Sequence, residues 1–271
     1  MGFPGIWMTE SERLVYRVVP KCACSTIGQI LYHADHGRWF DGDIHDAREG
    51  LHKWGLDHSR APIEAAVAAG RGLAFTCVRN PYDRILSAFF DKICGIQRNG
   101  RRYRGNLVPK IMRDYGVEPG DPETGFDFDQ IASFRRFLLF ARDTIRFRQP
   151  MEPDIHWSSI SGHVSTFIRG GGRYDRILRT EDLATGLRGV LRDAEVAHPV
   201  DPDDMPRFNE SAGHGPERAH PVAAYFDDLA THLVHEIYGR DFALFGYGPD
   251  PADRAAKREI DLEAVHVELG R

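Results

Sequence analysis

The sequence predicts an α/β fold in which helices flank a largely parallel sheet. Two observations support this class. A strand, a polar turn and a helix follow one another twice in the first part of the chain. Both strands are largely apolar, as strands buried on both faces of a sheet are. Because consecutive strands joined through helices are typical of parallel pairing, we expect the carboxyl ends of these strands to lie at one edge of the sheet.

The first strand is predicted over Leu14–Val19, which is rich in β-branched residues. Pro20 ends it, because proline cannot donate a hydrogen bond to a neighbouring strand. A short polar turn follows, and a helix is expected from Thr26 to Tyr32, with a hydroxyl residue as its cap.

The second strand–turn–helix segment is predicted from residue 73 onward. A helix over Ile63–Ala69 and a glycine turn precede the apolar strand Leu73–Val78. Arg79 and Asn80 then lead into a helix over Tyr82–Cys94, and Pro81 occupies the first turn, where proline is favoured.

The remaining elements are predicted with two long polar loops between them, over Tyr115–Asp129 and Glu195–Pro221. We predict a helix over Ile131–Ile145, a strand over Tyr174–Leu178 and a helix over Val222–Tyr238. That last helix has an apolar stripe formed by Val222, Tyr225, Phe226, Leu229, Leu233 and Ile237. No linker divides the chain, so we predict a single domain over residues 1–271, with the motifs in residues 14–247 and a tail over 248–271.

The composition excludes several classes of protein. The 271 residues include 40 acidic and 35 basic side chains, a formal charge of −5, so we expect no nucleic-acid partner. The longest apolar runs are far shorter than the ~20 residues that cross a bilayer. Residues 1–10 do not resemble a secretory signal, and four cysteines do not make a disulfide scaffold. We therefore expect a cytoplasmic protein without a transmembrane segment.

A first candidate anion site follows the first strand. A turn that enters a helix points backbone N–H groups and the positive end of the helix dipole at a bound group. Lys21 adds a charge and Ser25 and Thr26 add hydroxyl groups, which together suit a phosphate or a sulfate. Alternatively, the two hydroxyl residues only cap the helix and Lys21 is solvated. The loop lacks the Walker pattern of nucleoside triphosphatases, which disfavours magnesium-dependent ATP or GTP hydrolysis.

A second candidate anion site follows the second strand. Arg79 stands at the end of that strand, and Ser87 lies about two helical turns further on, with Arg84 one turn before it on the same face. An arginine fork and a hydroxyl bind a phosphate dianion well. Alternatively, Arg79 pairs with Asp83 and Ser87 only packs. Two anion sites at neighbouring strand ends suggest one ligand with two separated anionic groups.

These two motifs resemble those of the carbohydrate sulfotransferases that use 3′-phosphoadenosine 5′-phosphosulfate (PAPS), the family of the chondroitin and dermatan enzymes. Residues 19–26 are similar to the family's 5′-phosphosulfate loop and residues 78–89 to its 3′-phosphate motif. Later blocks match in the same order over Asp154–Trp157, Tyr174–Ile177, Thr180–Leu183, Phe208–Ser211 and Tyr238–Tyr247. The cysteines that flank the His-Trp segment in Golgi members are absent here.

The resemblance implies a sulfotransferase fold related to that of the P-loop NTPases, and transfer of a sulfuryl group to an acceptor hydroxyl, expected to be that of a carbohydrate. The second product is adenosine 3′,5′-bisphosphate, and no metal is required. Lys21 would stabilise charge on the leaving 5′-phosphate, and Arg79 and Ser87 would hold the 3′-phosphate. The predicted donor loop that holds the 5′-phosphate comprises Lys21, Cys22, Ala23, Cys24, Ser25 and Thr26.

The reaction also needs a base for the acceptor hydroxyl, and histidine suits that role at neutral pH. In the family this group usually comes from the stretch between the two phosphate motifs, which here contains several histidines. We favour His45, because nearby acids such as Asp43 and Asp46 would orient its ring, and then His52. The alternative for either histidine is an ordinary surface residue.

Three further features have two interpretations each. His156 and Trp157 either line an acceptor pocket, with the indole against a sugar face, or form a core tryptophan with a histidine partner. The basic cluster over Arg98–Arg104 either meets an anionic group or is a solvated loop. The thiols of Cys22, Cys24 and Cys77 meet at one sheet edge, and we hypothesise that Lys21 and the helix lower their pKa values.

Two other functions stay open at this point: a non-catalytic protein that binds a nucleotide bisphosphate, and a nucleotide kinase of related fold. The identity of the acceptor and the oligomeric state are not encoded in any recognisable motif.

Overall fold

The computed structural model describes residues 5–45, 65–96, 100–120, 127–204 and 216–271. Its internal contacts form two compact units. Unit 1 comprises Met1–Arg79, Ile160–Asn209 and Ile260–Arg271, and unit 2 comprises Asn80–Ser159 and Glu210–Glu259. Each unit combines segments that are distant in sequence, so no single cut of the chain separates them. The single-domain organisation stays a prediction.

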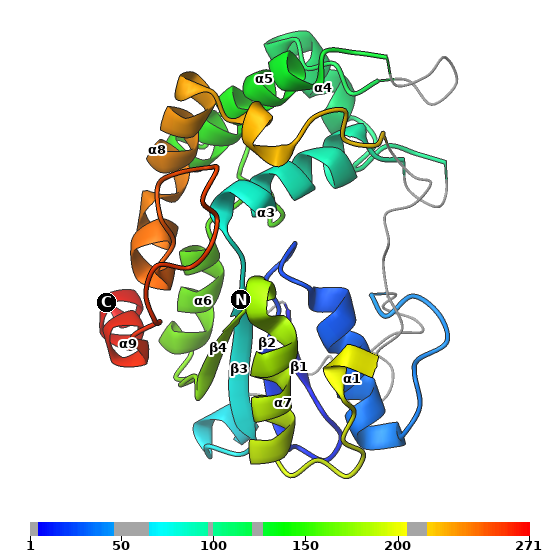
Figure 1. Ribbon diagram of the computed structural model, residues 1–271, viewed down its shortest axis with the longest axis vertical. Coiled ribbons are helices and arrows are strands. Elements are labelled where there is room, and N and C mark those ends of the chain that lie inside the picture. Colours follow the sequence, from blue (N-terminus) through cyan, green and yellow to red (C-terminus); the bar gives the residue numbers. More distant parts are fainter. Residues whose placement is uncertain (1–4, 46–64, 97–99, 121–126, 205–215) are drawn as a thin grey trace. The chain divides into compact units, whose positions relative to one another are not determined.

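Unit 1 contains a four-stranded sheet in the order β1-β2-β3-β4 (Figure 1). The strands are β1 (Ile6–Met8), β2 (Leu14–Arg17), β3 (Leu73–Val78) and β4 (Arg176–Arg179). β2, β3 and β4 run parallel, and β1 pairs antiparallel with β2. The predicted α/β class and its three strands are confirmed. β1 was not predicted, since only three residues form it.

Helices cover both faces of this sheet. α7 (Leu183–Asp193) packs on β3 and β4, where Leu178 lies directly against Gly186. α6 (Ile160–Arg169) packs on β2, and the buried Arg17 donates from Nε to the carbonyl of His163 at 3.0 Å. Leu178 and Arg17 belong to opposite faces in the strand register, so α7 and α6 lie on opposite sides (Figure 1). α9 (Leu262–Gly270) packs on α6.

The helix after β2 begins earlier than predicted. α1 covers Cys24–His36, and its N-cap is Ala23, which makes no side-chain capping bond. Neither Ser25 nor Thr26 is the cap, because both lie inside the first turn. The hydroxyl groups of the loop are therefore not needed to begin the helix.

Unit 2 is helical. α3 (Pro81–Ala88) continues as a π-helix over Phe89–Cys94, and α5 (Gln130–Arg142) as a π-helix over Asp143–Phe147. Both extend close to the predicted ends. α4 (Leu107–Tyr115) packs on α5, and α5 packs on α8 (Asp228–Phe245). The core of this unit is aromatic and includes the fully buried Phe89, Phe134, Phe137, Phe140 and Trp157.

The last predicted helix is wrong at its start. Residues Val222–Tyr225 form a 3₁₀ turn, and α8 begins at Asp228, because the Asp227 carboxylate accepts from the Ala230 N–H at 2.9 Å and caps it there. Leu229 of the predicted apolar stripe is consequently 47% exposed, whereas Leu233 and Ile237 are buried.

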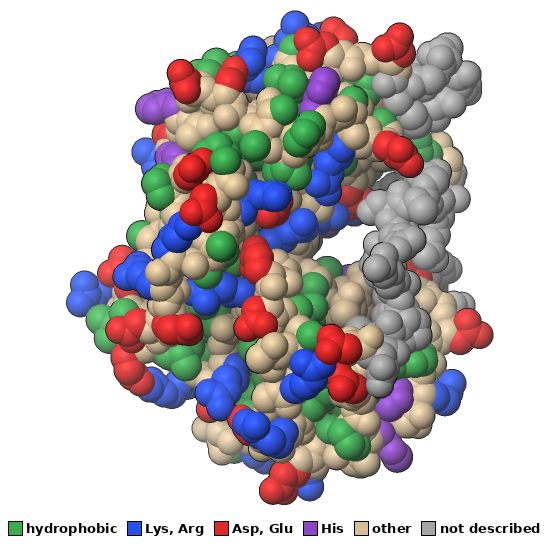
Figure 2. Space-filling model, in the orientation of Figure 1, with side chains coloured by type: hydrophobic (Ala, Val, Ile, Leu, Met, Phe, Trp, Pro, Cys, Tyr) green, Lys and Arg blue, Asp and Glu red, His purple; other side chains and the backbone are tan. Residues whose placement is uncertain are grey.

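Charged side chains of both signs are interspersed on the face of unit 1 that carries α7 (Figure 2). Several form ion pairs there, such as Arg188 with Asp201 at 2.9 Å. Within the described residues, no helix is long and apolar enough to cross a membrane.

Candidate functional site

The loop between β2 and α1 has a strained backbone. Lys21 and Ala23 have φ values of 68° and 59°, in the left-handed region that residues with a side chain rarely adopt. Each such residue costs about 1–2 kcal/mol. The Cys22 N–H donates to the Val19 carbonyl at 3.2 Å, so this amide closes the turn. Left-handed residues beside right-handed ones aim successive N–H groups into a concavity that binds anions.

The first turn of α1 supplies further donors. The first bond of the helix runs from the Ile27 N–H to the Ala23 carbonyl at 3.0 Å. The N–H groups of Cys24, Ser25 and Thr26 therefore have no partner within the helix. They lie at the positive end of the helix dipole, beside Lys21. The predicted donor loop thus has the geometry of an anion site. The N–H of Cys22 closes the turn and is therefore not one of the donors of this site.

Arg79 brings the second predicted motif to this loop. It follows β3 directly, and its Nη1 donates to the carbonyl of Lys21 at 3.2 Å. The two motifs are 58 residues apart in sequence, and the parallel pairing of β2 and β3 joins them at one sheet edge. Asp83, the alternative partner considered for Arg79, accepts from Arg254 at 2.6 Å.

His45 also lies at the loop. Its Nε2 is 2.7 Å from Ser25 Oγ and 3.8 Å from Cys24 Sγ. Of the neighbouring acids, Asp43 accepts from the backbone N–H of His45 at 3.0 Å, and the predicted orientation of the ring by these acids stays a prediction. His52 and Asp46 lie outside the described residues.

The proposed reactivity of the thiols is wrong in its direction. Burial raises the pKa of Cys24 and outweighs the opposing effect of Lys21. Burial also raises the pKa of Cys77 well above its ordinary value, and the other thiols add to the effect. Both side chains are therefore neutral thiols at pH 7 and are poor nucleophiles.

Arg84 does not serve as an anion ligand. It is 1% exposed, and its guanidinium donates to the carbonyls of Ser158 at 2.7 Å and Ile155 at 3.3 Å. Ser87, partly buried on α3, belongs to unit 2 with it, whereas Arg79 belongs to unit 1.

The His-Trp segment of unit 2 is organised around a buried carboxylate. Asp154 accepts from the Nδ1 of His156 at 2.7 Å, from the hydroxyl of Tyr103 at 2.9 Å and from the Nε of Arg104 at 3.1 Å. Its side chain is 0% exposed, and hydrogen bonds from His156 hold its pKa below the usual value despite the opposing effect of burial. Because a carboxylate only accepts, Nδ1 of His156 carries the proton in this bond.

Trp157 is part of the core. It is 0% exposed, donates from Nε1 to the hydroxyl of Thr144 at 3.3 Å and packs against Phe137 and Phe140. Its carbonyl accepts from Tyr238 at 2.5 Å. The indole has no face open to a sugar, so the structure favours the core interpretation of Trp157, while His156 remains partly exposed.

Members of the Arg98–Arg104 cluster are engaged with the protein. Arg104 binds Asp154, and Arg102 donates to the carbonyl of Ile93 at 3.2 Å. Arg98 lies outside the described residues. The cluster therefore supports local structure in unit 2.

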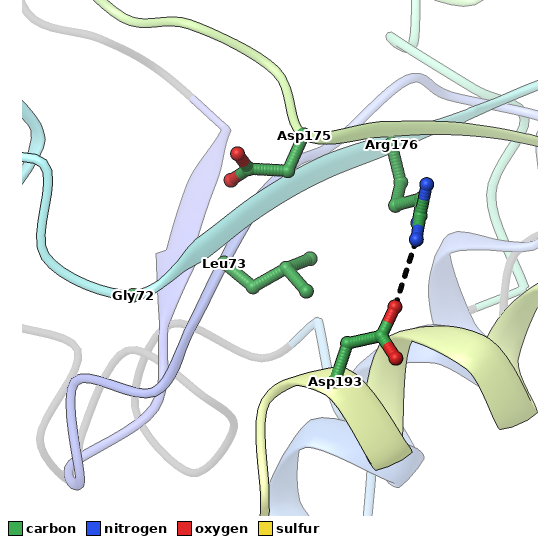
Figure 3. Close-up of a pocket in the computed structure, with 5 residues that line it drawn as sticks. All are labelled: Gly72, Leu73, Asp175, Arg176 and Asp193. Atoms are coloured by element: carbon green, nitrogen blue, oxygen red, sulfur yellow. Dashed lines mark hydrogen bonds and ion pairs between the residues drawn. The ribbon is translucent and has the colours of Figure 1, made fainter.

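A separate hollow of about 460 Å³ lies at the opposite end of the sheet from the loop (Figure 3). Arg176 and Asp193 pair across it at 2.8 Å, and Asp175 accepts from the Ala74 N–H at 2.7 Å. The charged side chains that line this hollow bind other groups of the protein. No predicted site residue lines it.

Sequence reasoning missed two contributors to these sites. Trp7 on β1 contacts the ring of His45, with centroids 5.5 Å apart. The strand that carries it has three residues, which is too short for its sequence pattern to predict a strand. Tyr103 was overlooked because it stands among arginines, and only the fold brings it to Asp154.

Comparison with known proteins gives a consistent result. Carbohydrate sulfotransferase 10 of Xenopus laevis is 27% identical over 180 residues, which cover 64% of this chain and 46% of that protein. The human carbohydrate sulfotransferase 10 gives the same identity and coverage. Carbohydrate sulfotransferase 8 of Mus musculus is 23% identical over 255 residues, 92% of this chain and 57% of that protein.

The chain thus spans about half the length of the curated relatives it matches. No solved structure matches it. The Sulfotransferase family matches residues 4–248, which include the strained loop, Arg79 and every later motif block. With both the motif order and this match in agreement, the chain belongs to the Sulfotransferase family.

Proposed function

We propose that the protein transfers a sulfuryl group from PAPS to a hydroxyl group of a carbohydrate acceptor. The observation that carries this proposal is the bond from Arg79 to the carbonyl of Lys21, because it unites two motifs that each suit one phosphate of a nucleotide bisphosphate. The family match and the carbohydrate sulfotransferase relatives support the same reaction.

The loop fits the donor's 5′-phosphosulfate. The N–H groups of Cys24, Ser25 and Thr26 bind its 5′-phosphate oxygens, and the Lys21 ammonium stabilises the charge that grows on the leaving oxygen. Arg79 binds the 3′-phosphate and so selects against ordinary ATP. We assign Ser87 to the 3′-phosphate as well, on the basis of the family motif alone.

His45 accepts the proton of the acceptor hydroxyl. In the transfer, the bond from sulfur to the 5′-phosphate oxygen breaks, a bond from the acceptor oxygen to sulfur forms, and the hydroxyl proton passes to Nε2 of His45. The Ser25 hydroxyl, 2.7 Å from that nitrogen, turns to the phosphate when the donor binds. Nε2 is then available to the acceptor. His52 is the alternative base, and His156 is an acceptor-binding residue on unit 2.

The donor site is tested by calorimetry with adenosine 3′,5′-bisphosphate, ADP and ATP with magnesium. We expect the bisphosphate to bind tightest and Arg79→Ala to weaken it by ~10- to 100-fold, since hydrogen bonds to charged groups contribute about 1.5–3 kcal/mol. Arg176→Ala, an exposed arginine at the opposite end of the sheet, is the matched control and should bind normally. Equal or tighter ATP binding would reject the donor assignment.

Turnover is measured as release of adenosine 3′,5′-bisphosphate from PAPS with a panel of neutral and acidic oligosaccharides. The oligosaccharide giving the fastest release serves as the reference acceptor. Tight bisphosphate binding with no release above hydrolysis for any of them would favour the non-catalytic alternative. A cytoplasmic location stays a prediction.

A further inference from the structure

Three aromatic side chains form a continuous row across the sheet of unit 1. The strand register places Phe75 of β3 beside Tyr16 of β2, and Tyr16 beside Trp7 of β1. Their rings are in contact, with centroids 5.0 Å apart for Phe75 and Tyr16 and 5.9 Å apart for Tyr16 and Trp7. All three are at most 2% exposed. The row is therefore a rigid part of the core rather than a surface patch.

The row ends at His45. The indole of Trp7 lies 5.5 Å from the imidazole, centroid to centroid, at an interplanar angle of 55°. His45 is itself exposed and lies in the stretch that follows α1. Its contacts include the indole on its ring, Ser25 and Cys24 at its Nε2 and Asp43 at its backbone N–H.

Some of these contacts hold the backbone of His45, and others hold its ring. Asp43 holds the backbone, because its carboxylate accepts from the His45 N–H at 3.0 Å. The hydroxyl of Ser25 holds the ring only until it turns to a phosphate oxygen. The indole lies on a buried strand and keeps its place when the hydroxyl bond is exchanged, so its face continues to position the ring.

We propose that Trp7 is a positioning residue that holds His45 against the donor loop, and that Tyr16 and Phe75 support it from the sheet. This rests on the proposed function, because it assigns a purpose to the orientation of the base. A flat, buried indole limits the ring to one region. Misplacing a catalytic group by about 1 Å can cost ~100-fold in rate.

The test compares Trp7→Leu, which removes the aromatic face, with Trp7→Phe, which keeps one. We expect Trp7→Leu to lower kcat with the reference acceptor by ~10- to 100-fold, up to the cost of misplacing a catalytic group and no more than the ~10²- to 10⁴-fold that a general base contributes. Trp7→Phe should stay within about threefold of the wild type, and the affinity for adenosine 3′,5′-bisphosphate should change less than about twofold in both variants. Thermal unfolding identifies any variant that has lost its fold.

The chain offers a matched control in Trp39 and His33. Their rings are in contact too, with centroids 4.5 Å apart, but they lie at the far end of α1 from the loop. Trp39→Leu should leave kcat and donor affinity unchanged. A loss equal to that of Trp7→Leu would mean that any damage to unit 1 lowers the rate, and the positioning role would be rejected.

A fluorescence measurement tests the contact without any acceptor. A protonated imidazole quenches an adjacent indole, so the emission of Trp7, taken as the wild-type spectrum minus that of Trp7→Phe, should fall on acidification from pH 8 to pH 5. His45→Gln should abolish this fall, and His33→Gln should not. A fall that persists in His45→Gln would overturn the contact itself.

The outcomes separate this inference from the proposed function. If Trp7→Leu keeps full kcat while His45→Gln loses it, the positioning role is wrong and the base stands. If His45→Gln keeps full kcat while the bisphosphate still binds, both the base and its positioning are wrong, and the donor site stands. If the bisphosphate does not bind the wild type, the proposed function fails at the donor site.

Discussion

Two segments with family motifs, the donor loop of unit 1 and the His-Trp segment of unit 2, use their polar groups in opposite ways. In the loop, two residues have left-handed backbone conformations and three successive N–H groups lack helical partners. In the His-Trp segment, the Asp154 carboxylate has several donors, and the carbonyls of Ile155 and Trp157 accept from Arg84 and Tyr238. A strained loop whose N–H groups lack helical partners is typical of a ligand site, whereas saturated hydrogen bonding indicates an anchored segment.

The largest effect of a substitution is expected in the anchored His-Trp segment. Trp157→Ala should lower the free energy of unfolding by about 3–5 kcal/mol, because it leaves a cavity among aromatic rings. Phe147→Ala, at a side chain in unit 2 that is 62% exposed, is the control and should cost less than about 0.5 kcal/mol. Denaturant unfolding measures both. A small effect of Trp157→Ala would mean that the segment is not anchored by its core.

In the donor loop, a substitution should lower the rate of the transfer reaction. Lys21→Ala is expected to lower kcat by ~10²- to 10³-fold, as loss of one group that stabilises transition-state charge does, with little change in stability. Lys110→Ala, an exposed lysine paired with Asp114, is the control and should keep full activity. A Lys21→Ala enzyme with normal kcat would remove the loop from the chemistry.

The pH dependence of stability sharpens the contrast further. The pKa of Asp154 is lowered in the folded protein, so the carboxylate stabilises the fold above the unfolded value, about 4 for aspartate, and this contribution is lost as the pH falls through the folded value. Asp154→Asn should cost about 2 kcal/mol at pH 7 and less at pH 3. Unfolding curves at both pH values check this, and an equal cost at both would contradict it.

The smallest effect is expected at Ala23. Ala23→Gly should raise the free energy of unfolding by about 1 kcal/mol at most, because glycine adopts the left-handed conformation without steric cost but has more freedom when unfolded. Ala23→Val should destabilise the protein, since a β-branched residue resists positive φ. Unchanged stability in both variants would show that the loop is not strained.

Much of the fold and of the loop followed from the sequence. The strand Leu73–Val78 was predicted with the bounds that the structure has, because it is largely apolar, as a buried parallel strand is, and has a clear turn at each end. Lys21 and Arg79 were placed at strand ends for the same reason, and parallel pairing then brings such ends together. These conclusions depend only on local pattern and on general rules of chain topology.

The tertiary structure alone decided what each polar group does. Arg84 and Arg79 look alike in the sequence, yet one is buried against carbonyls and the other reaches the loop. Lys21 alone would lower the pKa of Cys24, but packing buries the thiol and raises it. The contact of Trp7 with His45 joins residues that no periodicity connects. Local pattern specifies strands and helix ends, whereas burial and hydrogen-bond pairing depend on segments that meet only in the folded chain.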